Sequence, residues 1–134
     1  MKIELVAIGT VKNNYKALKD CPPNGWGSDI NSQIHIHKEY IDGLTGLFEG
    51  EVIHVLWWCD RAPRDILKNR VGKDEFETGV FAMRSPHRPN PIALSLCRII
   101  SINDNVLTVC GLESLDGSIV LDIKRAIWYD GGWL

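Results

Sequence analysis

Alternating apolar and polar positions in the first half of the chain predict short β-strands. Residues Ile3–Val11 alternate imperfectly and predict a first strand, whereas Gln33–His37 has the clean period-two alternation of a half-buried strand. Glu51–Cys59 is apolar on both faces, so we expect a central strand, or a strand buried between the sheet and a partner chain. Lys38–Leu47 has apolar residues at helical spacing, but its two glycines limit the expectation to one or two helical turns.

The second half of the chain continues as strands separated by turn signals. Ile92–Ile102 predicts a long strand, and Asn103–Asn105 predicts a tight turn because Asn and Asp tolerate left-handed backbone geometry. Val106–Cys110 is then expected to return antiparallel. An Asp116-Gly117 turn precedes a final strand at Ile119–Ile123. Repeated short strands with little helix predict a mainly β fold, an antiparallel barrel or sandwich, in a single domain spanning residues 1–134.

The composition is that of one ordinary globular domain, and it argues against a membrane-spanning, a secreted or a strongly basic protein. The chain has 134 residues, 45% of them hydrophobic and 24% charged, which is enough for a single core. No apolar run approaches the roughly 20 residues of a membrane helix, and the start lacks the apolar block of a secretory signal, so we expect a cytoplasmic protein. The net charge of −2 gives no attraction of the whole molecule to nucleic acid, although local basic clusters remain available.

Cysteine and histidine spacing does not predict a metal centre. The four cysteines are widely separated and form no C-x-x-C pair, which argues against a zinc ribbon or a redox dithiol. Cys59, Cys97 and Cys110 lie among apolar, strand-like residues, and we interpret them as small core residues. His35 and His37 share one strand face but have no third ligand in a recognisable motif, so exposed histidines are the expectation and no metal site is predicted.

The most distinctive stretch is Gly79–Ser95, which runs from an apolar, strand-like segment through a polar loop into a second apolar strand. Three prolines stiffen the loop, and each one pushes its preceding residue toward extended geometry. Arg84 and Arg88 place two guanidinium groups within five residues. This pattern indicates a binding site for a carboxylate, a phosphate or a nucleobase edge, or else a rigid connector with solvated charges.

Two further segments carry candidate binding residues. The polar loop Lys12–Ser32 is unusually long for a compact domain, and its Trp26 either covers a ligand or anchors the loop. Residues Asp60–Asp74 form the most basic window, which is either a solvated excursion or a patch that faces phosphates. The chain lacks a dinucleotide-binding glycine motif, a P-loop and a nucleophile elbow. The chemistry is therefore expected to depend on binding and positioning, as in a group transfer.

Residues Gly79–Ser95 closely resemble the defining motif of the TsaA-like (TrmO, YaeB) proteins, and Gly111–Lys124 resembles their second motif. Ile8-Gly9 and Trp58–Ala62 resemble further family positions in the correct order. The resemblance implies a small β-barrel that binds S-adenosyl-L-methionine, commonly as a homodimer with the cofactor near the subunit interface. It also implies transfer of a methyl group to N6 of the threonylcarbamoyl-modified adenosine 37 of a tRNA, which makes tRNA the expected partner.

The resemblance also assigns residues to the site. Those expected at the cofactor are Asn24, Asp60, Arg61, Arg84, Leu94, Leu112 and Glu113. Those expected to bind substrate or to shape the loops are Ser85, Arg88, Pro89, Asn90, Pro91, Asp116, Asp122 and Lys124. Asn90 would either bond an adenine edge or hold its loop, and Asp116 and Asp122 would mainly support turns. The resemblance assigns no catalytic acid or base.

The chain departs from the family pattern at three places. Pro22–Gly25 replaces the usual Pro-Arg-Gln-Gly and so removes an arginine near the cofactor or substrate. Gly50–Val52 replaces a usual Phe-Ser-His, and Asp122–Ala126 replaces Asp-Ile-Lys-Pro-Tyr. The chain ends soon afterwards, so we expect no additional C-terminal domain. Two alternatives stay open: a cofactor-dependent enzyme with a small-molecule or other modified-base acceptor, and a non-catalytic, cofactor-sensing dimer.

Overall fold

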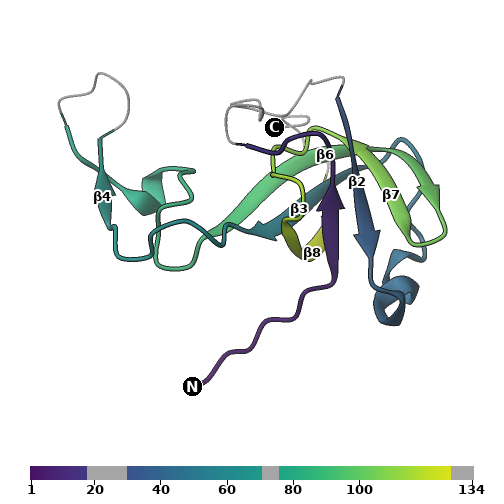
Figure 1. Cartoon of the computed structure of the whole chain (residues 1–134), viewed down its shortest axis with the longest axis horizontal. Helices are drawn as coiled ribbons and strands as arrows, with labels where there is room; N and C mark the ends of the chain where they lie inside the picture. The colour runs from purple at the N-terminus through teal and green to yellow at the C-terminus, as the bar shows by residue number, and fades with distance from the viewer. Residues whose placement is uncertain (18–29, 71–75, 128–134) are drawn as a thin grey trace. The chain divides into compact units, whose positions relative to one another are not determined.

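The computed structural model describes residues 1–17, 30–70 and 76–127 (Figure 1). The candidate residues Asn24 and Trp26 lie outside this part of the chain. The described chain divides into two compact units, residues 1–57 with 94–127 and residues 58–93, and each is described by itself. Among the residues described, no helix is both long and apolar enough to cross a membrane.

The first unit is a closed barrel of antiparallel strands in the order β1-β2-β7-β6-β3-β8. This confirms the predicted mainly β fold and decides between barrel and sandwich. The six strands are β1 (Gly9–Lys12), β2 (Asn31–Ile36), β3 (Val52–Trp58), β6 (Ile92–Asn103), β7 (Val106–Cys110) and β8 (Ile119–Arg125). One 3-10 helix, η2 (Lys38–Leu44), follows β2 and confirms the helical turns predicted there.

The barrel interior is filled by the inward positions of these strands. Side chains alternate between the two faces of a strand, so every second residue of a barrel strand points into the interior. The β2 pattern shows this directly, because Ser32, Ile34 and Ile36 are buried while Asn31 and Gln33 are exposed. The central cluster consists of Val11, Ile34, Ile36, Ile53, Val55, Cys97, Ile99, Leu107, Val109, Leu112 and Val120.

The two predicted turns occupy the backbone geometry that their residues suggested. Asp104, between β6 and β7, has a φ of 56°, which is the left-handed geometry that Asp tolerates. Gly117, before β8, has a φ of 86°. The β6–β7 ladder also contains a register shift between Ile99 and Ser101, an irregularity of the bulge type that bends long barrel strands.

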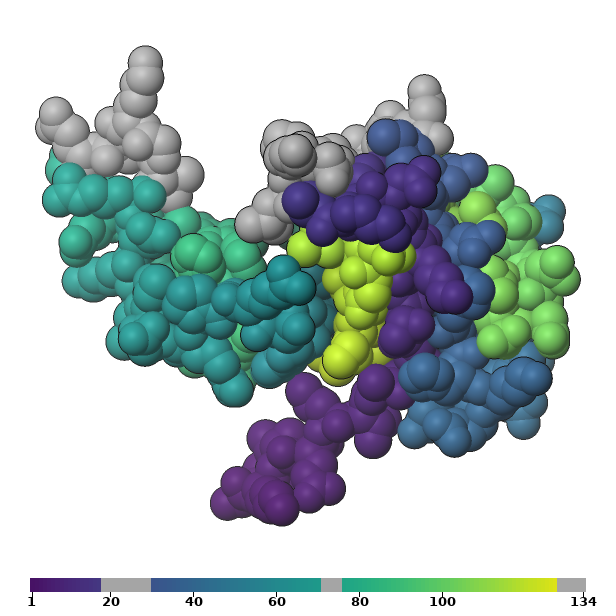
Figure 2. All heavy atoms as spheres, in the orientation of Figure 1, coloured from purple at the N-terminus to yellow at the C-terminus, as the bar shows by residue number. Residues whose placement is uncertain are grey.

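The first strand is shorter than predicted. Strand β1 begins at Gly9, and residues 1–8 are not part of the sheet. The apolar side chains of this segment are exposed: Ile3 retains 74% of its surface and Leu5 retains 56%. Alternation alone therefore gave the wrong start, because residues 1–7 have no neighbouring strand to pair with. We call residues 1–7 the N-terminal arm, and Figure 2 shows it in purple, projecting from the barrel.

The second unit contains a two-stranded antiparallel sheet and one short turn. Strands β4 (Lys68–Asn69) and β5 (Thr78–Gly79) pair through Lys68↔Gly79 and Asn69↔Thr78. The 3-10 turn η3 (Val80–Ala82) follows at once. The apolar segment from Gly79 was predicted to be strand-like, and this was wrong for Val80–Ala82. The turn buries the Val80 side chain and leaves Phe81 82% exposed. The apolar residues here therefore do not alternate between two faces of a strand, and only Val80 is buried.

Candidate functional site

The candidate residues fall on both units. Those of the second unit are Asp60, Arg61, Arg84, Ser85, Arg88, Pro89, Asn90 and Pro91. Those of the barrel unit that the structure describes are Leu94, Leu112, Glu113, Asp116, Asp122 and Lys124.

Arg88 organises the proline-rich loop from within. Its Nη1 donates hydrogen bonds to the carbonyl oxygens of Met83 (3.1 Å) and Ser85 (3.0 Å), and its Nη2 donates to the carbonyl of Val80 (2.9 Å). The planar guanidinium suits this task because it offers several donors in fixed directions. One of the two predicted guanidinium groups is thereby used to hold η3 and the following loop together.

A second arginine, which the sequence placed only in a basic window, also holds this loop. Arg64 Nε donates to the carbonyl of Pro89 at 2.7 Å, and its Nη2 donates to Asn90 Oδ1 at 3.2 Å. The same guanidinium lies 5.4 Å from the ring centroid of Trp58, within the range of a cation–π contact. Arg64 therefore acts as a brace, and the Asn90 side-chain oxygen is one of its acceptors.

The remaining loop residues complete a stiff frame. Ser85 Oγ accepts a hydrogen bond from the His87 N–H at 3.2 Å, and the buried Pro91 accepts one from the Cys59 N–H at 2.9 Å. Asp60, Arg61 and Arg84 have exposed side chains around this frame. The loop fixed by these hydrogen bonds thus presents the Arg84 guanidinium, and the turn after β3 presents the Asp60 carboxylate and the Arg61 guanidinium.

In the barrel unit, Glu113 belongs to a short polar chain. Trp57 Nε1 donates to Ser95 Oγ at 3.0 Å, and Ser95 Oγ lies 3.3 Å from Glu113 Oε1. Leu112 is only 2% exposed and belongs to the core, whereas Leu94 is 40% exposed. Burial raises the pKa of the nearby Cys97 thiol strongly, with smaller contributions from Cys110 and Glu113, so this thiol stays protonated.

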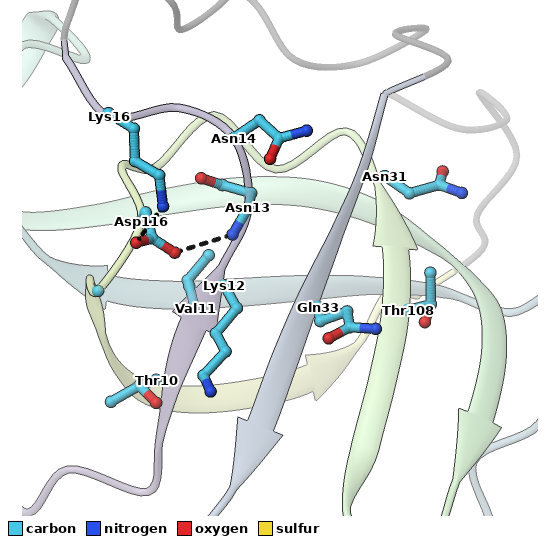
Figure 3. Close-up of a pocket in the computed structure, with 11 residues that line it drawn as sticks. Thr10, Val11, Lys12, Asn13, Asn14, Lys16, Asn31, Gln33, Thr108 and Asp116 are labelled. Atoms are coloured by element: carbon cyan, nitrogen blue, oxygen red, sulfur yellow. Dashed lines mark hydrogen bonds and ion pairs between the residues drawn. The ribbon is translucent and has the colours of Figure 1, made fainter.

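Asp116 is fixed by a network that the sequence did not reveal. Its Oδ1 accepts the Asn13 N–H at 3.0 Å, and its Oδ2 lies 2.7 Å from Lys16 Nζ (Figure 3). The Lys16 bond, followed by the Asn13 N–H, holds the pKa of Asp116 below its usual value. Asn13 also donates to Ser32 Oγ (3.0 Å) and to the Ser114 carbonyl (2.9 Å), and its Oδ1 accepts the Tyr15 N–H (2.9 Å).

An open pocket of about 840 Å³ borders this network (Figure 3). It is lined by amide, hydroxyl and charged side chains of β1, the segment after β1, β2 and β7, and by the turn at Asp116 and Gly117. Those side chains are Thr10, Lys12, Asn13, Asn14, Lys16, Asn31, Gln33, Thr108 and Asp116. Among the described lining residues, Asp116 is the one that was predicted as a site residue. The signal for Asn13 was an amide directly after a buried strand, where such side chains often bond to local backbone.

Two buried hydroxyl groups beside the same segment lack a hydrogen-bond partner in the described part of the chain. They are Tyr15 Oη and Ser114 Oγ, on residues that are 3% and 0% exposed. Buried hydroxyls are normally paired, so these two are exceptions among the described residues. The Tyr15 carbonyl also accepts the Asp116 N–H at 2.8 Å, which links the tyrosine to the turn.

Asp122 and Lys124 lie elsewhere on the barrel. They form an exposed ion pair of 3.5 Å on β8. Asp122 lines a different groove, beside η2, and Asp122 Oδ1 accepts the backbone N–H of Ile123. The barrel therefore separates these two predicted residues from the pocket at Asp116. The described residues contain no group of three or more His, Cys, Asp or Glu side chains placed to hold a metal ion.

These features define a small antiparallel barrel carrying a braced, arginine-rich loop unit and a polar pocket at one turn. Residues 10–129 match the tRNA-methyltransferase O N-terminal domain, and the chain belongs to this family. The predicted family is thereby confirmed.

Relatives in two archaea are similar over most of their length. An S-adenosyl-L-methionine-binding protein of Archaeoglobus fulgidus is 45% identical over 90% of this chain and 87% of the relative. A probable S-adenosyl-L-methionine-binding protein of Methanothermobacter thermautotrophicus is 39% identical over 92% of this chain and 90% of the relative.

Solved structures of TrmO share the fold. One superposes with a TM-score of 0.79 at 25% identity, and TrmO from Pseudomonas aeruginosa superposes with a TM-score of 0.77 at 25% identity. Each match covers 95% of this chain. The chain spans 58% and 57% of the length of these TrmO chains.

Proposed function

We propose that the chain binds S-adenosyl-L-methionine and transfers its methyl group to N6 of the threonylcarbamoyl-modified adenosine 37 of a tRNA. The observation that carries this proposal is the family match over residues 10–129, which includes both motifs. The names of the archaeal relatives support the cofactor. A tRNA acceptor is supported by the family description and by the likeness to TrmO, and the choice of modified adenosine 37 follows from the motif resemblance.

The chemistry of the donor set agrees with this cofactor, which carries an ammonium group, a carboxylate, ribose hydroxyls and an adenine. Arg84 and Arg61 are exposed cations for the carboxylate, and Asp60 is an exposed anion for the ammonium or ribose. Glu113 supplies a half-buried carboxylate, and the unsatisfied Ser114 hydroxyl lies beside it in sequence. Leu94 offers exposed apolar surface for the adenine.

When bound, the cofactor supplies a methyl group on a positively charged sulfur. The task of the protein is then to hold a nitrogen in line with that bond and to exclude competing water. Arg88 and Arg64 contribute indirectly, because their bonds fix the loop that carries Arg84 and Ser85. We assign Arg88 and Arg64 to positioning, and we assign no group as general base.

The first experiment separates binding from catalysis. Titration calorimetry with S-adenosyl-L-methionine should detect binding, and Arg84→Ala should weaken it at least about tenfold, the loss expected for one charge-assisted hydrogen-bonding group. Arg70→Ala is the matched control, because Arg70 is an exposed arginine on the same unit outside the assigned set. No binding at millimolar cofactor would reject the proposal, and equal affinity of the Arg84 variant would remove that residue from the site.

The second experiment addresses the acceptor. The chain is incubated with cofactor and with tRNA that carries the threonylcarbamoyl modification, and nucleosides are analysed by mass spectrometry. A methylated product supports the tRNA assignment. Normal cofactor binding without that product favours a different acceptor or a cofactor-sensing protein, both consistent with relatives named only for binding. Binding of tRNA should also weaken steeply as salt rises, because phosphate contacts release counterions.

A further inference from the structure

Ser95 is a polar residue at an inward position of a barrel strand. On β6 it lies on the same face as the buried Cys97 and Ile99, and it is itself only 2% exposed. Inward positions of a small barrel are normally apolar, and a polar side chain at such a position is usually there for a function. The Ser95 hydroxyl has a partner on each of two sides, and both partners belong to the barrel unit.

These two partners fix the direction of the hydroxyl proton. An indole N–H can only donate, so the 3.0 Å bond from Trp57 Nε1 occupies a lone pair of Ser95 Oγ. The hydroxyl has a single proton, and its recorded acceptor in the described part of the chain is Glu113 Oε1, 3.3 Å away. The hydrogen bonds therefore run in one direction, from the indole through the hydroxyl to the carboxylate.

The backbone that carries Glu113 is held on both sides. Its two neighbours, Leu112 and Ser114, are 2% and 0% exposed. The Ser114 carbonyl also accepts a hydrogen bond of 2.9 Å from Asn13 Nδ2. With the backbone fixed, the place of the half-buried carboxylate depends on the rotation of the Glu113 side chain. The bond from Ser95 acts on that rotation.

We propose that Ser95 is a positioning residue, which aims the Glu113 carboxylate at a hydrogen-bond donor of bound S-adenosyl-L-methionine. This role rests on the proposed function, since the ligand is the cofactor proposed there. A carboxylate offers about four acceptor positions, so an orienting bond from Ser95 is compatible with bonds to the ligand. A carboxylate that is aimed in advance loses less freedom when the ligand binds, which raises affinity. Trp57 acts one step further away, by holding the hydroxyl.

The first test is a double-mutant cycle of Ser95→Ala and Glu113→Gln, with the affinity for S-adenosyl-L-methionine measured by calorimetry. Ser95→Ala should weaken binding about 3–10-fold in the parent chain, the effect of one lost hydrogen bond. In the Glu113→Gln background, the same substitution should change the affinity less than about twofold, because no carboxylate remains to be aimed. A hydroxyl that only stabilises the barrel would weaken binding equally in both backgrounds, and that result would overturn the proposal.

Two further variants complete this test. Trp57→Phe keeps an aromatic ring and removes the indole N–H, so it should weaken binding in the same direction as Ser95→Ala. Ser101→Ala is the matched control, because Ser101 is a half-buried serine of the same strand, and it should leave the affinity unchanged. Parent-like affinity of both the Ser95 and the Trp57 variants would overturn the proposal, whereas a parent chain that binds no cofactor rejects the proposed function.

The second test needs no cofactor and follows the indole proton of Trp57 by NMR, with its resonance identified by its loss in Trp57→Phe. Glu113→Gln should move this resonance upfield, because removal of the charged acceptor weakens the preceding bond from the indole to Ser95. Asp116→Asn is the control, since that carboxylate bonds to Asn13 and Lys16 instead, and it should leave the resonance in place. A resonance that Glu113→Gln leaves unchanged would overturn the proposal, whatever the result with cofactor.

Discussion

The indole N–H of Trp57 on β3 donates a 3.0 Å hydrogen bond to the Ser95 hydroxyl on the neighbouring strand β6. Ser95 is 2% exposed and lies on the same face of β6 as Cys97 and Ile99, which belong to the core. Its hydroxyl also lies 3.3 Å from Glu113 Oε1. The buried Ser95 hydroxyl thus connects the candidate site carboxylate of Glu113 to Trp57 on strand β3.

Ser95→Ala should therefore destabilise the protein by about 1–3 kcal/mol, the range for leaving a buried polar group without its partner. Chemical denaturation followed by tryptophan fluorescence measures this change. Ser101→Ala is a suitable control, because Ser101 lies on the same strand, is half-buried and makes no side-chain hydrogen bond in the described structure. An equal, small effect of both substitutions would show that the Trp57 bond contributes little.

Asn13→Ala should lower the free energy of unfolding more than the matched substitution Asn14→Ala does. The Asn13 side chain bonds to Ser32, Ser114 and Tyr15, so its removal leaves several partners unsatisfied and is expected to cost about 2–3 kcal/mol. Asn14→Ala should change stability by less than about 0.5 kcal/mol, because Asn14 is exposed. Thermal denaturation of both variants provides the comparison, and similar melting temperatures would contradict the assigned role.

The Asp116–Lys16 pair predicts a specific dependence of stability on pH. The bond to Lys16 and the Asn13 N–H lower the folded-state pKa of Asp116. A lowered folded pKa gives stability that is fully present above the unfolded value, about 4, and is lost as pH falls through the folded value. The stability difference between the parent chain and Asp116→Asn should thus be constant near pH 7 and shrink below about pH 4. Acid titration of unfolding tests this, and a pH-independent difference would contradict it.

The elements that were predicted correctly are those whose cause is local. The Asp104 and Gly117 turns follow from residues that tolerate positive φ, and the alternation at Gln33–His37 predicted a strand where β2 spans Asn31–Ile36. The arm was predicted to be a strand for the same local reason. Whether an alternating segment forms a strand depends on a partner, and the arm has none in the described chain.

The candidate site was less accessible to sequence reasoning because its contacts join distant positions. Asn13 and Asp116 are separated by 103 positions, and Arg64 and Pro89 by 25. The proline-rich motif revealed that its loop was stiff and rich in arginine. It did not reveal that Arg88 bonds to three carbonyls of its own loop, because a guanidinium is equally suited to anions and to backbone oxygens.

The role of Arg88 in shaping its loop can be tested through the stability of that loop. Arg88→Lys should lose most of the three bonds, since a single ammonium cannot reproduce a planar fork, and should destabilise by about 2–3 kcal/mol. Hydrogen exchange should rise in residues 80–90 before it rises in the barrel. Arg61→Ala is the control, because the exposed Arg61 makes no interaction with the described residues. Equal exchange in the two variants would argue against a loop-shaping role.

The close packing of β1 against β2 explains why the Ile8-Gly9 position holds a glycine. A Cβ at Gly9 would lie 2.5 Å from the His35 carbonyl oxygen and 3.2 Å from the Ile36 Cα, both backbone atoms of the paired strand. Gly9→Ala must therefore push β1 away from β2, and the expected cost is about 1–3 kcal/mol, as for overpacking. Gly43→Ala meets open space and should change stability by less than about 0.5 kcal/mol. Urea denaturation of the two variants measures the difference, and equal midpoints would show that β1 and β2 separate at little cost.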